Sequence, residues 1–282
     1  MGFAETVLLG GIAGSTIYIG LPFGRIEHVD DRVRVALAMF SVGILAFIFM
    51  DVSSHAENLV SGALTSFKHR HTGFGTVLAR FALLAIGFTV GAAGISVAER
   101  RVRHRSSASR GLVAGGASEG VTVPVLDPVE ARRRALQTGM TIAGAIGLHN
   151  LAEGLAIGVS ARAGAISLAT VLIVGFSVHN ATEGFGIVGP LGMTRPSWRW
   201  LGLAGLVGGG PTFLGTIIGY QVQSAPLELA FYALAGGAIL YVIGEVWMSM
   251  RRYGHRTLGL YLLAGGFIVG VATDLIVAYG GG

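Results

Sequence analysis

The sequence contains no cysteine and little charge. The absence of cysteine excludes disulfide bonds, thiolate metal ligands and a cysteine nucleophile. Only 12% of the residues are charged, whereas 52% are hydrophobic, which is not the balance of an ordinary water-soluble domain. The chain also lacks a phosphate-binding loop of the Walker type, so ATP-driven chemistry is not expected. The excess of hydrophobic over charged residues predicts a polytopic membrane protein.

Glycine is abundant by contrast. The chain of 282 residues contains 46 glycines, more than twice the usual share of about 7%. Several recur four residues apart within apolar segments, as in the pairs Gly154/Gly158 and Gly215/Gly219. Small residues at this spacing let transmembrane helices approach closely, where lipid gives the helices no hydrophobic reason to associate. The glycines therefore predict a closely packed helical bundle.

Eight apolar segments are long enough to cross about 30 Å of hydrocarbon, which requires roughly 20 helical residues each. We expect an all-α bundle with helices 1–3 within residues 1–98 and helices 4–8 within residues 135–282. Residues 99–134 are polar and basic, and they are predicted to form a flexible cytoplasmic loop. The eight predicted segments cover approximately residues 4–23, 34–57, 73–98, 135–160, 165–189, 198–221, 226–250 and 257–279.

Basic residues are concentrated in alternate loops of this predicted bundle. The chain carries 20 Lys and Arg against 15 Asp and Glu, a net charge of +5. Because basic loops stay in the cytoplasm, we expect a protein of the cell membrane, plasma or inner, with both termini outside. The first segment is acidic at Glu5 and lacks a basic start, so it is predicted to be a retained helix and not a signal peptide. Topology accounts for the arginines, and nucleic-acid binding is not expected.

One short motif occurs in two neighbouring segments: His149-Asn150-Leu151-Ala152-Glu153-Gly154 recurs as His179-Asn180-Ala181-Thr182-Glu183-Gly184. On a helix, residues four apart lie on the same face, so each copy presents an imidazole beside a carboxylate. Two such antiparallel helices would bring two histidines and two glutamates together near the middle of the membrane. Nitrogen and oxygen ligands of this kind suit Zn²⁺, Fe²⁺ or Mn²⁺ and do not single one out.

Other interpretations of the motif must be weighed. A polar contact that holds helices together would explain one intramembrane histidine, but ionisable groups at this depth are costly, and their matched repetition favours an ion site. An intramembrane hydrolase would require His-Glu-x-x-His, and a di-iron protein would require Glu-x-x-His on two helices; neither pattern is present. An enzyme is therefore not expected. The alternatives that stay open are an intramembrane metal-dependent enzyme and a metal-binding receptor.

The second segment turns polar in its outer half. Asp51, Ser54, His55 and Asn58 are spaced three and four residues apart and form one helical stripe. The stripe is typical of a helix that emerges into the lipid headgroups, and equally of a vestibule that collects cations. The sequence leaves both interpretations open.

These features resemble the Zrt/Irt-like, or ZIP, family of divalent metal transporters. The resemblance rests on the eight predicted segments, the outside termini, the long loop after the third segment and the two His/Glu motifs. It implies import of a metal ion into the cytoplasm, with Zn²⁺ first and Fe²⁺, Mn²⁺ or Cd²⁺ as alternatives. Its expected partners are the ion and the lipid bilayer, and a homodimer is compatible with it. The implied transport site comprises His149, Asn150, Glu153, His179, Asn180 and Glu183, with Asp51, His55 and Glu245 along the pathway.

The sequence departs from the family pattern at three positions. Ala152 replaces the proline that commonly precedes the motif glutamate. Gly210 stands before Pro211 where many members carry a glutamate that completes a second metal position. Asn180 stands where some binuclear members have aspartate. These departures predict one strong metal site and at most a weak second one.

Overall fold

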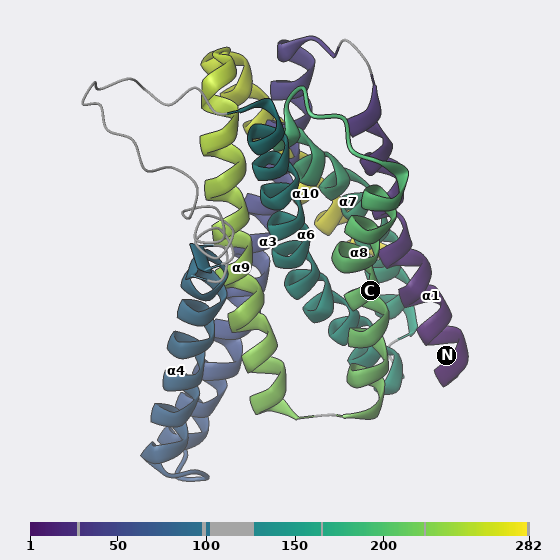
Figure 1. Ribbon diagram of the computed structural model, residues 1–282. Coiled ribbons are helices and arrows are strands. Elements are labelled where there is room, and N and C mark those ends of the chain that lie inside the picture. The colour runs from purple at the N-terminus through teal and green to yellow at the C-terminus, as the bar shows by residue number, and fades with distance from the viewer. Residues whose placement is uncertain (27–28, 98–99, 102–126, 165, 223, 281–282) are drawn as a thin grey trace, which may run out of the picture.

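The computed structural model describes residues 1–26, 29–97, 100–101, 127–164, 166–222 and 224–280. Within these ranges all regular structure is helical, which confirms the expected all-α class (Figure 1). The helices are α1 (Phe3–Ser15), α2 (Ile17–Gly20), η1 (Leu21–Arg25), α3 (Asp31–Lys68), α4 (Phe74–Thr89), η2 (Val90–Gly94), α6 (Pro128–Arg162), α7 (Ile166–Val188), η3 (Gly189–Leu191), α8 (Trp198–Gln221), α9 (Ala225–Met250), η4 (Arg251–Tyr253) and α10 (Arg256–Gly280).

Seven helical spans within the described residues are long and apolar enough to cross a membrane. They fall on seven of the eight predicted segments. The remaining predicted segment, 165–189, is the helix α7, which is not among those seven spans. The multi-pass character of the chain is thus confirmed, while the count of eight crossings stays a prediction.

Two helices extend beyond their predicted bounds. The helix α3 was expected to end near residue 57 but continues to Lys68, a length of 38 residues or roughly 57 Å at 1.5 Å per residue. The helix α6 begins at Pro128 and not near residue 135. Its start is fixed by Asp127, whose side chain accepts a hydrogen bond from the Val129 amide, and by proline in the first turn. Most of the predicted loop, residues 102–126, lies outside the described residues.

Close packing between α6 and α8 depends on glycine. A Cβ atom added to Gly154 on α6 would collide with the Thr212 carbonyl oxygen on α8. A Cβ atom added to Gly215 on α8 would collide with the Leu151 carbonyl oxygen on α6. The two backbones therefore touch without an intervening side chain, as the glycine spacing predicted. This contact sets the position of the α6 turn that carries the first His/Glu motif.

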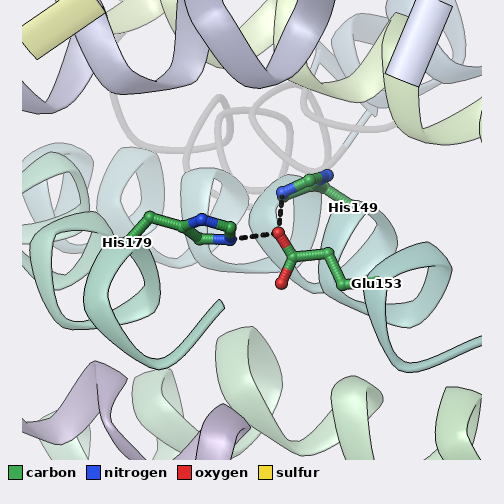
Figure 2. Close-up of side chains that lie close together, drawn as sticks. All are labelled: His149, Glu153 and His179. Atoms are coloured by element: carbon green, nitrogen blue, oxygen red, sulfur yellow. Dashed lines mark hydrogen bonds and ion pairs between the residues drawn. The ribbon is translucent and has the colours of Figure 1, made fainter. Parts of the chain in front are cut away.

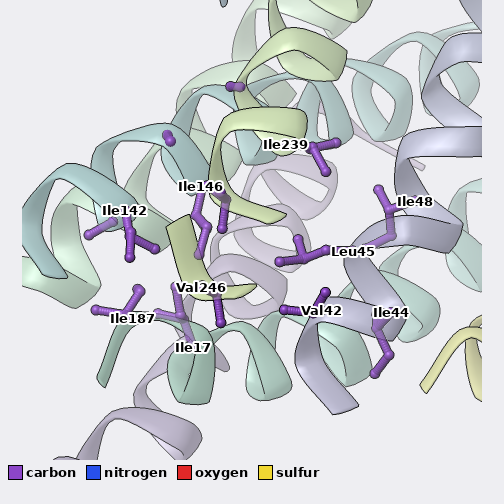
Figure 3. Close-up of a cluster of buried hydrophobic side chains, with 14 of the residues drawn as sticks. Ile17, Val42, Ile44, Leu45, Ile48, Ile142, Ile146, Ile187, Ile239 and Val246 are labelled. Atoms are coloured by element: carbon purple, nitrogen blue, oxygen red, sulfur yellow. The ribbon is translucent and has the colours of Figure 1, made fainter. Parts of the chain in front are cut away.

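A core of branched aliphatic side chains lies next to the motif, where α2, α3, α6, α7 and α9 meet (Figure 3). Ile146 and Ile142 on α6 stand one and two turns before His149, so their burial fixes the rotation of α6 about its axis. The motif residues are thereby turned toward α7. The core residues, each at most 1% exposed, include Ile17, Val42, Leu45, Ile142, Ile146, Ile187, Ile239 and Val246.

Candidate metal centre

The two copies of the motif meet between α6 and α7. His149 and Glu153 are one turn apart on α6, and Nε2 of His149 lies 2.7 Å from Oε1 of Glu153. His179 on α7 directs its Nε2 to the same carboxylate oxygen (Figure 2). Glu153 therefore stands between two imidazoles from different helices. The three side chains offer ligand atoms that all lie within 4.8 Å of one another.

This cluster is almost fully withdrawn from solvent. The side chains of His149, Glu153 and His179 are 0%, 3% and 13% exposed. Nδ1 of His149 and Oε2 of Glu153 have no hydrogen-bond partner among the described residues. Buried polar atoms without a partner are costly, and buried charges need a compensating charge. The cluster is thus chemically suited to a divalent cation, which would take lone pairs and balance the carboxylate.

Glu183, the glutamate of the second motif, is adjacent to the cluster of His149, Glu153 and His179 but is not one of its three members. Oε1 of Glu183 is 3.7 Å from Nε2 of His149, and it has no hydrogen-bond partner among the described residues. Oε2 of Glu183 accepts a hydrogen bond from Nδ2 of Asn150 at 3.1 Å. The same Asn150 nitrogen also donates to the Gly208 carbonyl on α8, at 2.9 Å. Asn150 therefore positions Glu183 through its nitrogen and leaves its own oxygen without a described partner.

The second asparagine contacts a different helix. Nδ2 of Asn180 donates to the Ala13 carbonyl on α1 at 3.2 Å, and its side-chain oxygen has no partner among the described residues. Asn180 thus attaches α7 to α1, and a role as a metal ligand stays a prediction. On α8, Gly210 and Pro211 offer no side-chain oxygen at the position where a second site would need a carboxylate.

A small cavity connects the predicted pathway to the cluster. It has a volume of about 70 Å³, and its lining includes Asp51 on α3, Phe176 and His179 on α7, and Asp274 on α10. Because a carboxylate and a cluster histidine share one cavity, the structure favours the vestibule interpretation of the polar stripe. Asp274 was not predicted from the sequence. The available signal was a single carboxylate within an otherwise apolar segment.

The other two pathway residues lie apart from the cavity lining. Nδ1 of His55 is 3.5 Å from Oδ1 of Asp51, and the two side chains are 55% and 41% exposed. The His55 ring packs on Tyr232 of α9, with 5.5 Å between ring centroids. Glu245 is partly buried on α9 and does not belong to the three-residue cluster. The pathway role of both His55 and Glu245 remains a prediction.

Fold and site together define a multi-pass helical membrane protein with a buried histidine and glutamate cluster suited to a divalent cation. No family model matches the chain. The chain is similar to the zinc transporter ZupT of Clostridium perfringens (strain 13 / Type A), with 32% identity over 147 residues. The match covers 50% of this chain and 51% of the relative, so it spans about half the length of that protein. The similarity supports the ZIP-type resemblance seen in the sequence.

Proposed function

We propose that this protein transports divalent transition-metal ions, with Zn²⁺ as the principal ion, into the cytoplasm. The observation that carries the proposal is the buried cluster of His149, Glu153 and His179, drawn from two predicted membrane-crossing helices. The similarity to a zinc transporter supports the same conclusion and favours zinc over iron, manganese and cadmium. The proposed orientation, with both termini outside, rests on the distribution of arginines.

The proposed path begins at the cavity lined by Asp51 and Asp274. Their carboxylates attract a cation, which reaches His179 in the lining of the same cavity. Neutral imidazoles of His149 and His179 then replace water, and ionised Glu153 and Glu183 balance the two positive charges. Charge balance lowers the cost of holding a dication away from water, which is the main barrier to its crossing.

The proposal makes the protein a carrier and not an enzyme. Hydrolysis by a metal-bound water would require a general base in addition to the ligands. In this cluster Glu153 already contacts both imidazoles, and Glu183 is held by Asn150. A receptor that binds the metal without moving it is the remaining alternative, because its site would have the same ligands.

Flux into sealed vesicles separates these alternatives. Purified protein is reconstituted into liposomes that enclose a zinc-sensitive dye, and external Zn²⁺ is added. We expect dye fluorescence to rise faster than in protein-free liposomes, and Fe²⁺, Mn²⁺ or Cd²⁺ to slow the rise in proportion to their affinity. Tight zinc binding to the reconstituted protein without any flux would refute transport and support a receptor.

The number of metal ions bound per chain gives a second test. Gly210 and Asn180 stand where a second metal position would need carboxylates, so that position lacks negative charge. We expect one zinc ion per chain, held by the His149, Glu153 and His179 cluster. Repulsion between two dications about 4 Å apart is severe at low dielectric, and neutral amide oxygens cannot offset it. Anomalous diffraction at the zinc edge counts the ions. Two fully occupied peaks bridged by Glu153 and Glu183 would contradict this expectation.

A further inference from the structure

A second cavity lies at the C-terminal end of α9, where the short helix η4 leads into α10. Its volume is about 370 Å³, and it is separate from the cavity that reaches the metal cluster. Its lining divides into two chemical parts. The apolar wall consists of Val35, Met39, Trp247 and Met250, and the basic rim consists of Arg251, His255 and Arg256.

The two arginines of the rim are exposed, and within the described ranges of the chain their guanidinium groups make no hydrogen bond or ion pair. Among the described residues, no carboxylate lines the cavity or lies within ion-pair distance of Arg251 or Arg256. The neighbouring Arg252 behaves differently, because its Nη2 donates to the Pro190 carbonyl at 2.9 Å and to the Tyr253 hydroxyl at 3.0 Å. Arg251 and Arg256 therefore retain their full capacity to bind an anion.

The backbone between the two arginines has an unusual shape. Gly254 and His255 have consecutive positive φ angles, 73° and 54°, and histidine rarely adopts this left-handed conformation. The chain changes direction at these two residues, so Arg251 before the turn and Arg256 after it line the same cavity. Arg256 is also the first residue of α10, and the amide groups of a first helical turn lack helical acceptors and favour negative charge.

We propose that this cavity binds an anionic phospholipid. The phosphate group lies between Arg251 and Arg256, and part of an acyl chain lies against the wall of Val35, Met39 and Met250. Basic pockets between transmembrane helices recognise lipid headgroups in this way. A free phosphate ion would use the arginines but gain nothing from the apolar wall. Trp247 is an aromatic residue of the kind enriched at membrane interfaces, which favours headgroup depth for the cavity. The inference does not depend on metal transport.

The experiment uses Trp247 as the reporter. The chain has three tryptophans, so Trp198→Phe and Trp200→Phe leave Trp247 alone. This protein is placed in nanodiscs of zwitterionic lipid that contain a few mole per cent of brominated phosphatidylglycerol or, in parallel, of brominated phosphatidylcholine. We expect markedly stronger quenching by the anionic lipid. Each arginine near an anionic lipid contributes roughly a fivefold preference, so Arg251→Gln with Arg256→Gln should reduce the enrichment by on the order of tenfold or more.

The matched control is Arg195→Gln with Arg199→Gln, which removes the same charge beside α8 and should leave the preference unchanged. If both double variants lose the preference equally, or if the parent protein shows none, the proposal fails. Relief of quenching by millimolar inorganic phosphate would also overturn it, because the site would then recognise the free ion. If the Arg251/Arg256 double variant does not fold, the Gly259→Leu variant tests the proposal in its place. It keeps both arginines and fills the wall near Met39, so retained preference refutes the lipid and lost preference supports it.

Discussion

Replacing Glu153 with glutamine is expected to reduce zinc uptake by about 100-fold or more while the protein still folds in the membrane. The carboxylate of Glu153 is the group that contacts both His149 and His179, and glutamine keeps its size but removes its charge. Uptake is measured in the dye-loaded liposomes at matched protein content. Glu183→Gln is expected to give a similar loss, because the second negative charge of the proposed site is then missing.

The control for this experiment is Glu130→Gln, which removes a carboxylate from the same helix. Glu130 pairs on α6 with Arg133 and Arg134, far along the helix from the cluster. Its loss should leave uptake near the wild-type rate, because single pairs of this kind contribute little. Wild-type uptake by Glu153→Gln at normal abundance would refute the assignment of the site.

Replacing Gly215 with alanine is expected to destabilise the protein by about 3 kcal/mol, and to lower its melting temperature by on the order of 10 °C. The added methyl group would overlap the Leu151 carbonyl oxygen and approach the Leu155 amide. Both are backbone atoms, so α8 must move away from α6. Because Leu151 lies between Asn150 and Glu153, the movement should also weaken zinc binding. Thermal unfolding in detergent, with and without zinc, measures both effects.

Gly202 provides the comparison on the same helix. An added Cβ atom there has nothing within 4 Å, so Gly202→Ala introduces no overlap. Alanine lowers the conformational freedom of the unfolded chain, and we expect a gain of up to about 1 kcal/mol. Equal melting temperatures for the two variants would contradict this prediction, because they would show that α8 can move away from α6 with little loss of stability.

Hydropathy predicted the existence of the helices well and some of their ends poorly. The bounds of α8 agree with its predicted segment, 198–221, because Ser197 caps the helix where the apolar residues begin. The end of α3 was missed because its apolar run stops near Met50, whereas the helix itself continues to Lys68. Apolarity reports where a helix meets lipid, and it carries no information about where a polar continuation ends.

The site was predictable in composition but not in its arrangement. Spacing along one helix places His149 beside Glu153, and this pair was expected. The sharing of Glu153 with His179, and the tie from Asn150 to Glu183, depend on how α6 and α7 are rotated and displaced against each other. Asp274 joins the cavity from α10, a helix distant in sequence from the motif. Contacts of this kind arise from tertiary packing, which no single-helix pattern specifies.

The unequal exposure of the cluster has a kinetic consequence. His149 and Glu183 are fully buried, whereas His179 is 13% exposed and lines the cavity that Asp51 also lines. The proposed entry route reaches the cluster from the side of His179 and Asp51. Delivery of the ion to the other side of the membrane therefore requires a rearrangement that closes this route and opens another. Such rearrangements take microseconds to milliseconds or longer. Uptake should consequently saturate as external zinc rises, and each molecule should pass far fewer ions per second than an open pore.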